Sequence, residues 1–273
     1  MKKFLSTAMV LGALYGTANA APITSPIYMP EAGKILSNIN FGYTMRRSDD
    51  DIEDVDTNFS TDKMYDGVNL GMEGKIGLMD NLAINYGLNF DFAAKSFDEK
   101  ISSRFTNFYV GLTDRIINSG ANKLDLILNV GQADDVFLSD VNRAYVDFGV
   151  RYGLELDKYN LGFSIKGKYV NDYENSNEAS VDGGFDVAFA LENEFIFTEN
   201  FTVGLDLTYS LNDDYDDLNS YNVFGFNVDA NYALNQNNFI GAYYGMDFND
   251  ASEDDLDIKP ITYKFGLKFT SQF

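Results

Sequence analysis

The sequence contains no cysteine, no histidine and no tryptophan, and only four prolines. Without cysteine the chain cannot be held by disulfides, so a packed core or a ladder of backbone hydrogen bonds must stabilise it. Without histidine or cysteine, a transition-metal site lacks its usual ligands and acid–base catalysis near neutral pH lacks its usual residue. A carboxylate dyad or a Ser–Lys pair would still be possible chemistry, but no spacing singles one out. We therefore expect no catalytic residue, no cofactor and no metal site.

Long hydrophobic runs are also missing. Beyond the N-terminus no stretch reaches the roughly 18 uninterrupted apolar residues of a transmembrane helix. The N-terminus has two lysines, a short apolar run from Phe4 to Tyr15 and the sequence Ala18-Asn19-Ala20. This pattern predicts a secretory signal peptide over residues 1–20. Residues 21–33 hold three of the four prolines and predict an extended periplasmic lead-in, which leaves residues 34–273 for the fold.

Positive charge is scarce. The chain has 20 Lys and Arg against 42 Asp and Glu, giving a formal net charge of −22. This balance argues against nucleic acid and against anionic surfaces as partners. Much of the acidic excess lies between the predicted strands, at Asp49, Asp50, Asp51, Glu53, Asp54, Asp56, Asp213, Asp214, Asp216, Asp217, Asp250, Glu253, Asp254, Asp255 and Asp257.

These acidic stretches have two interpretations. They are solvated, mutually repelling surface loops, or they attract divalent cations, which prefer carboxylate oxygens. The segment from Asp54 to Asn58 begins like a calcium-binding loop, but Phe59 replaces the required glycine and Tyr65 replaces the closing glutamate. The sequence therefore excludes an EF-hand and leaves only diffuse attraction of cations.

A repeat of about 40 residues divides the chain. Short polar turns occur near Asn81, Asn122, Asn160, Asn200 and Asn238. Each repeat holds two stretches in which apolar and polar residues alternate, as expected of a β-hairpin. We predict twelve strands, with 10 or 14 as alternatives, at Ile35–Arg46, Met64–Leu78, Leu82–Lys95, Arg104–Thr113, Leu124–Gln132, Ala144–Leu156, Leu161–Ile165, Phe185–Leu191, Val203–Tyr209, Phe224–Tyr232, Ile240–Met246 and Ile261–Phe273.

The last predicted strand is the most regular. Its apolar residues Ile261, Tyr263, Phe265, Leu267 and Phe269 alternate with polar residues and glycine, and Phe273 resumes the apolar row. This stretch resembles the terminal strand of bacterial outer-membrane β-barrels, in which a C-terminal Phe is the usual assembly mark. The resemblance implies an assembly signal read by the barrel-assembly machinery and formed by Phe265, Phe269 and Phe273.

The connections between the predicted strands are of two kinds. Those near the Asn residues are short, and the intervening ones are longer and acidic. An outer-membrane barrel has this asymmetry, whereas a soluble β-sandwich, the alternative all-β fold, has no reason to sort its loops in this way. The chain thus resembles the porin-like class over nearly all of its mature length. We expect an all-β, closed, antiparallel, up-and-down transmembrane barrel, surrounded by the lipid of the cell outer membrane.

Charged residues on the polar face of the predicted strands would line the lumen, and the two signs are segregated. Basic residues lie on the sixth and seventh strands, acidic residues on the next three, and two lysines on the last. If the lumen is filled with water, these charges would create an electric field across it. If the lumen is narrower, cross-strand ion pairs would close it. The predicted pore-lining residues are Arg143, Arg151, Lys166, Lys168, Asp186, Glu192, Glu194, Asp206, Asp229, Lys264 and Lys268.

Two functions follow from this fold. The first is a porin-like channel for passive diffusion of small hydrophilic solutes, biased toward cations by the acidic loops. The second is a non-conducting surface barrel whose acidic extracellular loops serve adhesion or envelope integrity. Barrel phospholipases, lipid A acylases and deacylases and surface proteases resemble one another in using an active-site histidine, which this chain lacks. No feature of the sequence marks a subunit interface.

Overall fold

The computed structural model describes residues 22–47, 66–93, 102–134, 142–171, 173–174, 180–181, 183–212, 221–253, 256–258 and 261–273. The predicted signal peptide (residues 1–20) and most of the acidic residues named above lie outside these ranges. Within them, no helix is long and apolar enough to cross a membrane.

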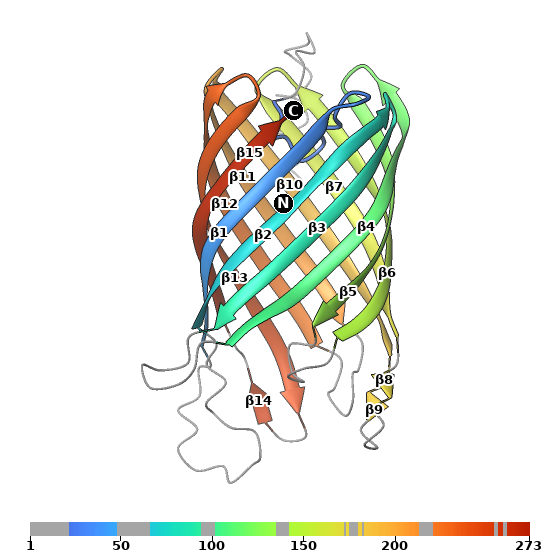
Figure 1. Ribbon diagram of the computed structural model, residues 1–273, viewed down its shortest axis with the longest axis vertical. Helices are drawn as coiled ribbons and strands as arrows, with labels where there is room; N and C mark the ends of the chain where they lie inside the picture. The colour runs from blue at the N-terminus through green and yellow to red at the C-terminus, as the bar shows by residue number, and fades with distance from the viewer. Residues whose placement is uncertain are drawn as a thin grey trace, which may run out of the picture.

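Twelve long antiparallel strands close into a single barrel (Figure 1). Sequential neighbours pair around the wall, and β15 pairs with β1 to complete the ring. The prediction of a closed barrel of twelve strands is confirmed. The strands are β1 (Ile35–Arg47), β2 (Asp66–Met79), β3 (Leu82–Ala93), β4 (Ser102–Ser119), β5 (Asn122–Asp134), β6 (Asn142–Leu156), β7 (Tyr159–Val170), β10 (Gly184–Thr198), β11 (Phe201–Asn212), β12 (Tyr221–Asn235), β13 (Asn238–Glu253) and β15 (Ile261–Gln272).

Three short strands lie outside the ring. Strands β8 (Tyr173–Glu174) and β9 (Ser180–Val181) pair with each other, and β14 (Leu256–Ile258) pairs with the end of β13. All three belong to the connections at one end of the barrel, the lower end in Figure 1.

The two ends of the barrel differ, as the sequence predicts. At one end five connections are turns of only two residues, at positions 80–81, 120–121, 157–158, 199–200 and 236–237. At the other end every connection is longer. The five predicted Asn positions lie in these turns or within two residues of them, because Asn accepts turn geometry that most residues avoid.

The side chains are arranged with apolar residues outward and polar residues inward. On β5, Leu126 and Leu128 point outward and are 43% and 49% exposed, whereas Asp125 and Asn129 point inward and are buried. A closed ring satisfies the strand backbone internally, so an apolar outer face can lie in lipid. The outer face of this barrel therefore meets the requirement for a membrane-spanning strand bundle.

Strand β4 departs from regular alternation at two places. Its register with β3 shifts beside Asn107, and its register with β5 shifts between Arg115 and Ile117. Each bulge inserts one extra residue and reverses the side-chain parity beyond it. The strand continues beyond the predicted end at Thr113 to Ser119, and the second bulge lies in this continuation.

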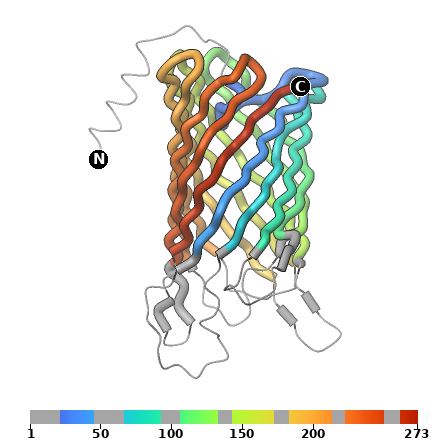
Figure 2. Tube along the Cα trace, turned by 60° about the vertical axis from the view of Figure 1, so that its left-hand side comes forward, coloured from blue at the N-terminus to red at the C-terminus, as the bar shows by residue number. Residues whose placement is uncertain are grey.

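The segment from Pro22 to Lys34 does not form the extended lead-in that the sequence predicts. It makes three turns, closed by backbone hydrogen bonds from Ser25 to Pro22, from Tyr28 to Ser25 and from Lys34 to Glu31. Gly33 then adopts a φ of 80°, which only glycine adopts readily, and sends the chain into β1. The segment lies inside the end of the barrel that carries the two-residue turns (Figures 1 and 2).

Candidate functional site

Three consecutive backbone carbonyls hold the N-terminal segment across the lumen. Arg151 Nη1 donates to Pro26 O at 2.5 Å, Arg115 Nη2 donates to Ile27 O at 2.5 Å, and Lys75 Nζ donates to Tyr28 O at 2.8 Å. The three cations come from β6, β4 and β2. Hydrogen bonds from charged donors are stronger than neutral ones, so this set fixes the segment firmly. We call residues 22–33 the plug segment.

Apolar contacts anchor the plug segment on two sides of the lumen. Ile27 is only 2% exposed and lies against Gly153 of β6, where a Cβ atom would come within 2.6 Å of its Cγ2. With isoleucine at position 27, any side chain larger than glycine would clash here. On the other side, Ile23 packs in a small buried cluster formed with Leu36, Ala233 and Phe239.

Two further polar contacts complete the attachment. Thr24 Oγ1 donates to Glu194 Oε1 at 2.5 Å, and Gln272 Nε2 donates to the Tyr28 hydroxyl at 2.7 Å. Burial raises the pKa of the Tyr28 phenol above its usual value, so this group stays neutral at physiological pH. The plug segment thus contacts strands distributed around the ring, and it narrows this end of the lumen.

Asp125 organises the cations that bind the plug segment. It is 1% exposed, and its carboxylate accepts from Arg115 Nε at 2.8 Å and from Arg151 Nη2 at 2.9 Å. The two arginines are themselves buried. The carboxylate fixes both guanidinium groups so that their remaining donors face the carbonyls of the plug segment.

Replacing Asp125 with alanine should lower the free energy of unfolding by about 3 kcal/mol, because two buried guanidinium groups lose their shared counterion. Urea-driven unfolding of the barrel in lipid vesicles measures this change. The control is Asp114→Ala, which removes a carboxylate whose contact with Asn81 is solvent-exposed and should change stability by less than about 0.5 kcal/mol. Equal losses in the two variants would show that Asp125 has no organising role.

A cavity of about 500 Å³ lies in the lumen, lined by β1–β4 on one side and by β11, β12, β13 and β15 on the other. Neutral polar side chains make up most of its lining. They include two threonines, one tyrosine and the amides of Asn38, Asn40, Asn69, Asn89 and Asn227. Such amides both donate and accept hydrogen bonds.

Some of these neutral groups are already connected. Asn69 Nδ2 donates to Thr44 Oγ1 at 2.7 Å, and the Tyr243 hydroxyl donates to Asn69 Oδ1 at 3.5 Å. These two hydrogen bonds link β13, β2 and β1 across the seam where β15 pairs with β1. It fixes the orientation of the Asn69 amide in the cavity wall.

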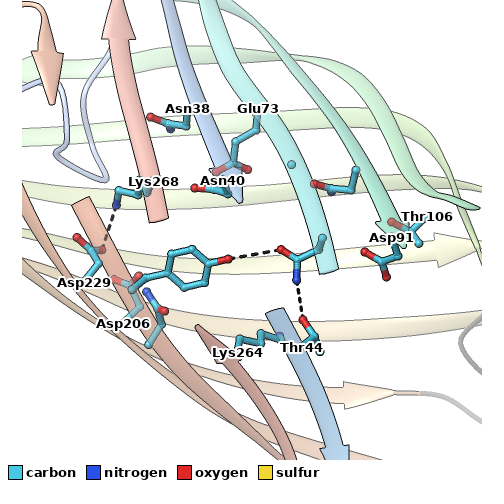
Figure 3. A pocket seen from close by; sticks show the side chains of 15 residues that line it. Asn38, Asn40, Thr44, Glu73, Asp91, Thr106, Asp206, Asp229, Lys264 and Lys268 are labelled. Carbon is cyan, nitrogen blue, oxygen red and sulfur yellow. Dashed lines mark hydrogen bonds and ion pairs between the residues drawn. The ribbon is translucent and has the colours of Figure 1, made fainter. Parts of the chain in front are cut away.

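Four carboxylates and two lysines also line the cavity. Lys268 Nζ lies 3.1 Å from Asp229 Oδ1 (Figure 3). Lys264 forms an ion pair with Asp247. Both lysines are therefore neutralised by aspartates, Lys264 by one on the adjacent strand β13 and Lys268 by one on β12. The carboxylates of Glu73, Asp91 and Asp206 leave the cavity with an excess of negative charge.

All eleven residues predicted to line the pore lie on the inward parity of their strands, alternating with exposed apolar side chains. The structure does not bring them together in one place. Arg151 and Glu194 contact the plug segment, whereas Asp206, Asp229, Lys264 and Lys268 line the cavity. The remaining five, Arg143, Lys166, Lys168, Asp186 and Glu192, lie on the wall formed by β6, β7 and β10.

The segregated charges are partly joined by cross-strand pairs. Lys168 Nζ lies 4.0 Å from Asp186 Oδ2, and Arg143 donates to the backbone carbonyl of Asn171. The sequence predicts either an open lumen with a transverse field or a narrower lumen closed by cross-strand ion pairs. The structure has such ion pairs, but a cavity remains. The lumen is thus narrowed without being filled along its whole length.

Several residues of the site were missed by the sequence analysis. They are Lys75, Arg115 and Asp125, which hold the plug segment, and Glu73 in the cavity. Each lies at an inward position of a predicted strand or just beyond its end, so strand parity was the signal that could have found them. The contacts between Arg115, Asp125 and the plug segment join positions up to 88 residues apart, which no local pattern reveals.

The structure is similar to several solved barrels. The COG4313 outer membrane channel from Pseudomonas putida F1 matches with a TM-score of 0.59 and 14% identity, over 90% of this chain and 97% of that chain. This chain shares its barrel fold with that channel. The NanC porin matches with a TM-score of 0.52 and 8% identity, over 84% of this chain and 98% of the porin.

The same fold also occurs in a barrel that is not described as a channel or porin. The β domain of the Bordetella autotransporter BrkA matches with a TM-score of 0.50 and 13% identity, over 89% of this chain and 100% of that domain. Neither a family model nor a curated protein matches the sequence. At these identities the comparisons show the fold alone, and function must be argued from the lumen.

Proposed function

We propose that this chain is an outer-membrane channel through which small hydrophilic solutes diffuse passively, with a preference for cations. The observation that carries the proposal is the polar cavity of about 500 Å³ inside a closed barrel with an apolar outer face. Water and polar solutes are stable in such a lumen, whereas lipid is excluded from it.

The cation preference rests on two observations. Carboxylates outnumber lysines in the cavity by four to two, and both lysines are paired with aspartates. The longer connections, at the end opposite the two-residue turns, contain many acidic residues in the sequence, and the net charge of the chain is −22. A negative potential at the mouth and in the lumen raises the local concentration of cations.

A second function is supported by the plug segment. Because this segment is bonded across one end of the lumen, a barrel of this form would conduct poorly and could instead present its acidic loops at the cell surface. Its role would then be adhesion or envelope integrity.

Planar-bilayer recording on the purified chain separates these two functions. A channel should give discrete conductance steps, and under a KCl gradient its reversal potential should have the sign expected of cation selectivity. The measurement is repeated at low and high salt. Salt screens the attraction between the acidic loops and cations, so the cation preference should weaken at high salt.

A matched variant tests the source of the selectivity. Replacing Asp206 and Asp229 with asparagine should shift the reversal potential toward zero, whereas Asp114→Asn, a charge change at the exposed rim, should leave it unchanged. Folded protein that gives no steps in several lipid compositions would exclude the channel and favour the surface barrel. An anion preference would exclude the proposed selectivity.

A further inference from the structure

The cavity has features of a binding site as well as of a passage. It lies to one side of the lumen, and its lining comes from non-adjacent parts of the chain, β1–β4 and β11–β15. Its volume of about 500 Å³ lies within the range of small-molecule sites in proteins. The plug segment bounds the lumen at one end, so a solute that enters from the other end meets this wall first.

The neutral part of the lining favours a solute with several hydroxyl groups. Five asparagine amides, two threonine hydroxyls and the Tyr243 hydroxyl offer donors and acceptors in the same wall. A hydroxyl group both donates and accepts, so it can pair with either end of an amide. A solute with only acceptors or only charges would leave much of this wall unpaired, which opposes its binding.

The charged part of the lining favours a cationic group on that solute. Glu73 is exposed to the cavity and projects into the same space as Asn40 (Figure 3). Asp206 on β11 lies directly opposite Glu192 on β10. Like charges at opposed positions of neighbouring strands destabilise the pair unless a cation lies between or beside them.

Glu192 supplies an independent sign of a missing partner. Its Oε2 atom is buried and has no hydrogen-bond partner among the residues that the structure describes. Buried polar atoms in folded proteins are almost always paired, so an unpaired carboxylate oxygen beside a cavity points to a ligand or an ion. An ammonium group, with three donors, can satisfy more than one of these carboxylates.

The geometry argues against a metal ion as this cation. Within the described part of the chain, no three carboxylates are close enough to hold a metal ion. Divalent cations require several oxygens at short distances from one centre. Dispersed carboxylates among amides instead match an organic cation, which needs only one carboxylate for its ammonium group and pairs its hydroxyl groups with the amides.

We propose that the cavity binds a hydroxylated organic cation of the amino-sugar class, with one of the two carboxylates Glu73 and Asp206 receiving the ammonium group and the asparagine amides receiving the hydroxyl groups. This inference rests on the proposed function and names the solute class that the channel would prefer.

Saturation-transfer NMR on the folded chain in detergent tests the inference without requiring conductance. The probes are glucosamine, glucose, gluconate and methylammonium at one ionic strength. We expect glucosamine to bind best. Glucose and methylammonium should each bind at least about tenfold more weakly. Glucose lacks the charge and loses the hydrogen bonds to the carboxylate, and methylammonium lacks the hydroxyl groups and loses the hydrogen bonds to the amides. Gluconate should show no binding.

Two variants identify the site. The double variant Glu73→Gln, Asp206→Asn should weaken glucosamine binding about tenfold and leave glucose binding unchanged, since only the charged contacts are lost. The control Glu199→Gln makes the same chemical change in an exposed two-residue turn and should have no effect. Because Asp206→Asn also relieves repulsion with Glu192, the double variant should fold normally.

The outcomes separate this inference from the proposed function. Equal binding of gluconate and glucosamine, or an unchanged affinity in the double variant, would overturn the inference even if the barrel conducts ions. Displacement of glucosamine by stoichiometric Mg²⁺ would also overturn it, in favour of a metal site. Specific glucosamine binding in a barrel that gives no conductance steps would support the site and exclude the channel.

Discussion

A barrel that lacks residues 22–33 should conduct several-fold more current per channel than the full mature chain. The plug segment lies across one end of the lumen and is bonded there to Lys75, Arg115 and Arg151. Its removal exchanges protein for water at this constriction, and the three cations regain hydration. The twelve strands remain intact, because their pairing with one another does not involve residues 22–33. The deletion removes one backbone hydrogen bond to the sheet, from Gly33 N to Gly77 O. Single-channel recording at constant salt measures the change.

A disulfide supplies the control for this deletion. A Cβ atom on Gly153 would lie 3.1 Å from Ile27 Cβ, close to the roughly 3.5–4.5 Å between the Cβ atoms of a disulfide. The chain contains no other cysteine. The variant Ile27→Cys, Gly153→Cys should therefore oxidise readily, with a conductance equal to that of the native chain. Failure to form the disulfide would contradict the placement of the plug segment, and unchanged conductance after the deletion would show that the constriction lies elsewhere.

Deletion of Phe273 should prevent most of the chain from folding into the outer membrane. Phe273 N donates to Ile35 O at 2.9 Å and Phe273 O accepts from Ile35 N at 3.1 Å, so this residue forms the last backbone pair at the seam between β15 and β1. Its side chain is 69% exposed on the outer face, in one row with Phe265 and Phe269. The deletion removes two hydrogen bonds of about 1 kcal/mol each, together with the terminal aromatic of the proposed assembly signal.

Substitutions at the same end separate the assembly signal from the plug segment. Phe273→Asp keeps the backbone pair but places a charge on the apolar face, and it should also reduce the inserted fraction, as read from heat-modifiable gel mobility of isolated outer membranes. Gln272→Ala should insert normally, because Gln272 faces inward and its amide bonds the Tyr28 hydroxyl of the plug segment. Normal insertion of the Phe273 variants would argue against Phe273 as part of an assembly signal.

Local alternation predicts the barrel because the apolar and polar residues within a single strand already show which side faces lipid and which faces the lumen. In β15, Phe265 and Leu267 point outward while Lys264 and Lys268 point inward, and a period of two is visible without any partner strand. The same parity places all eleven predicted pore-lining residues on the inward face. Bulges interrupt the pattern, as beside Asn107 and at Ile116 of β4.

Parity says which residues face inward but not how far along the axis each one lies. The level of a side chain depends on strand tilt and on the register between neighbours, which accumulate around the ring. For this reason the sequence grouped Arg151 with Lys166 and Lys168 as one basic wall, whereas the structure pairs Arg151 with Asp125 at the plug segment. The division of the inward residues into a plug-binding set and a cavity-lining set follows from register.

The sequence alone determined the class of fold and the inward or outward side of most strand residues, because alternation and turn chemistry are local properties. It favoured twelve strands and left 10 or 14 as alternatives. The tertiary structure alone decided that residues 22–33 enter the lumen and that a polar cavity remains beside them. Pro22, Pro26 and Pro30 look like those of any extended linker. What draws the segment inward is a set of three cations and a buried Asp125 on four other strands, together with space left by Gly153, and these come together only when the ring has closed.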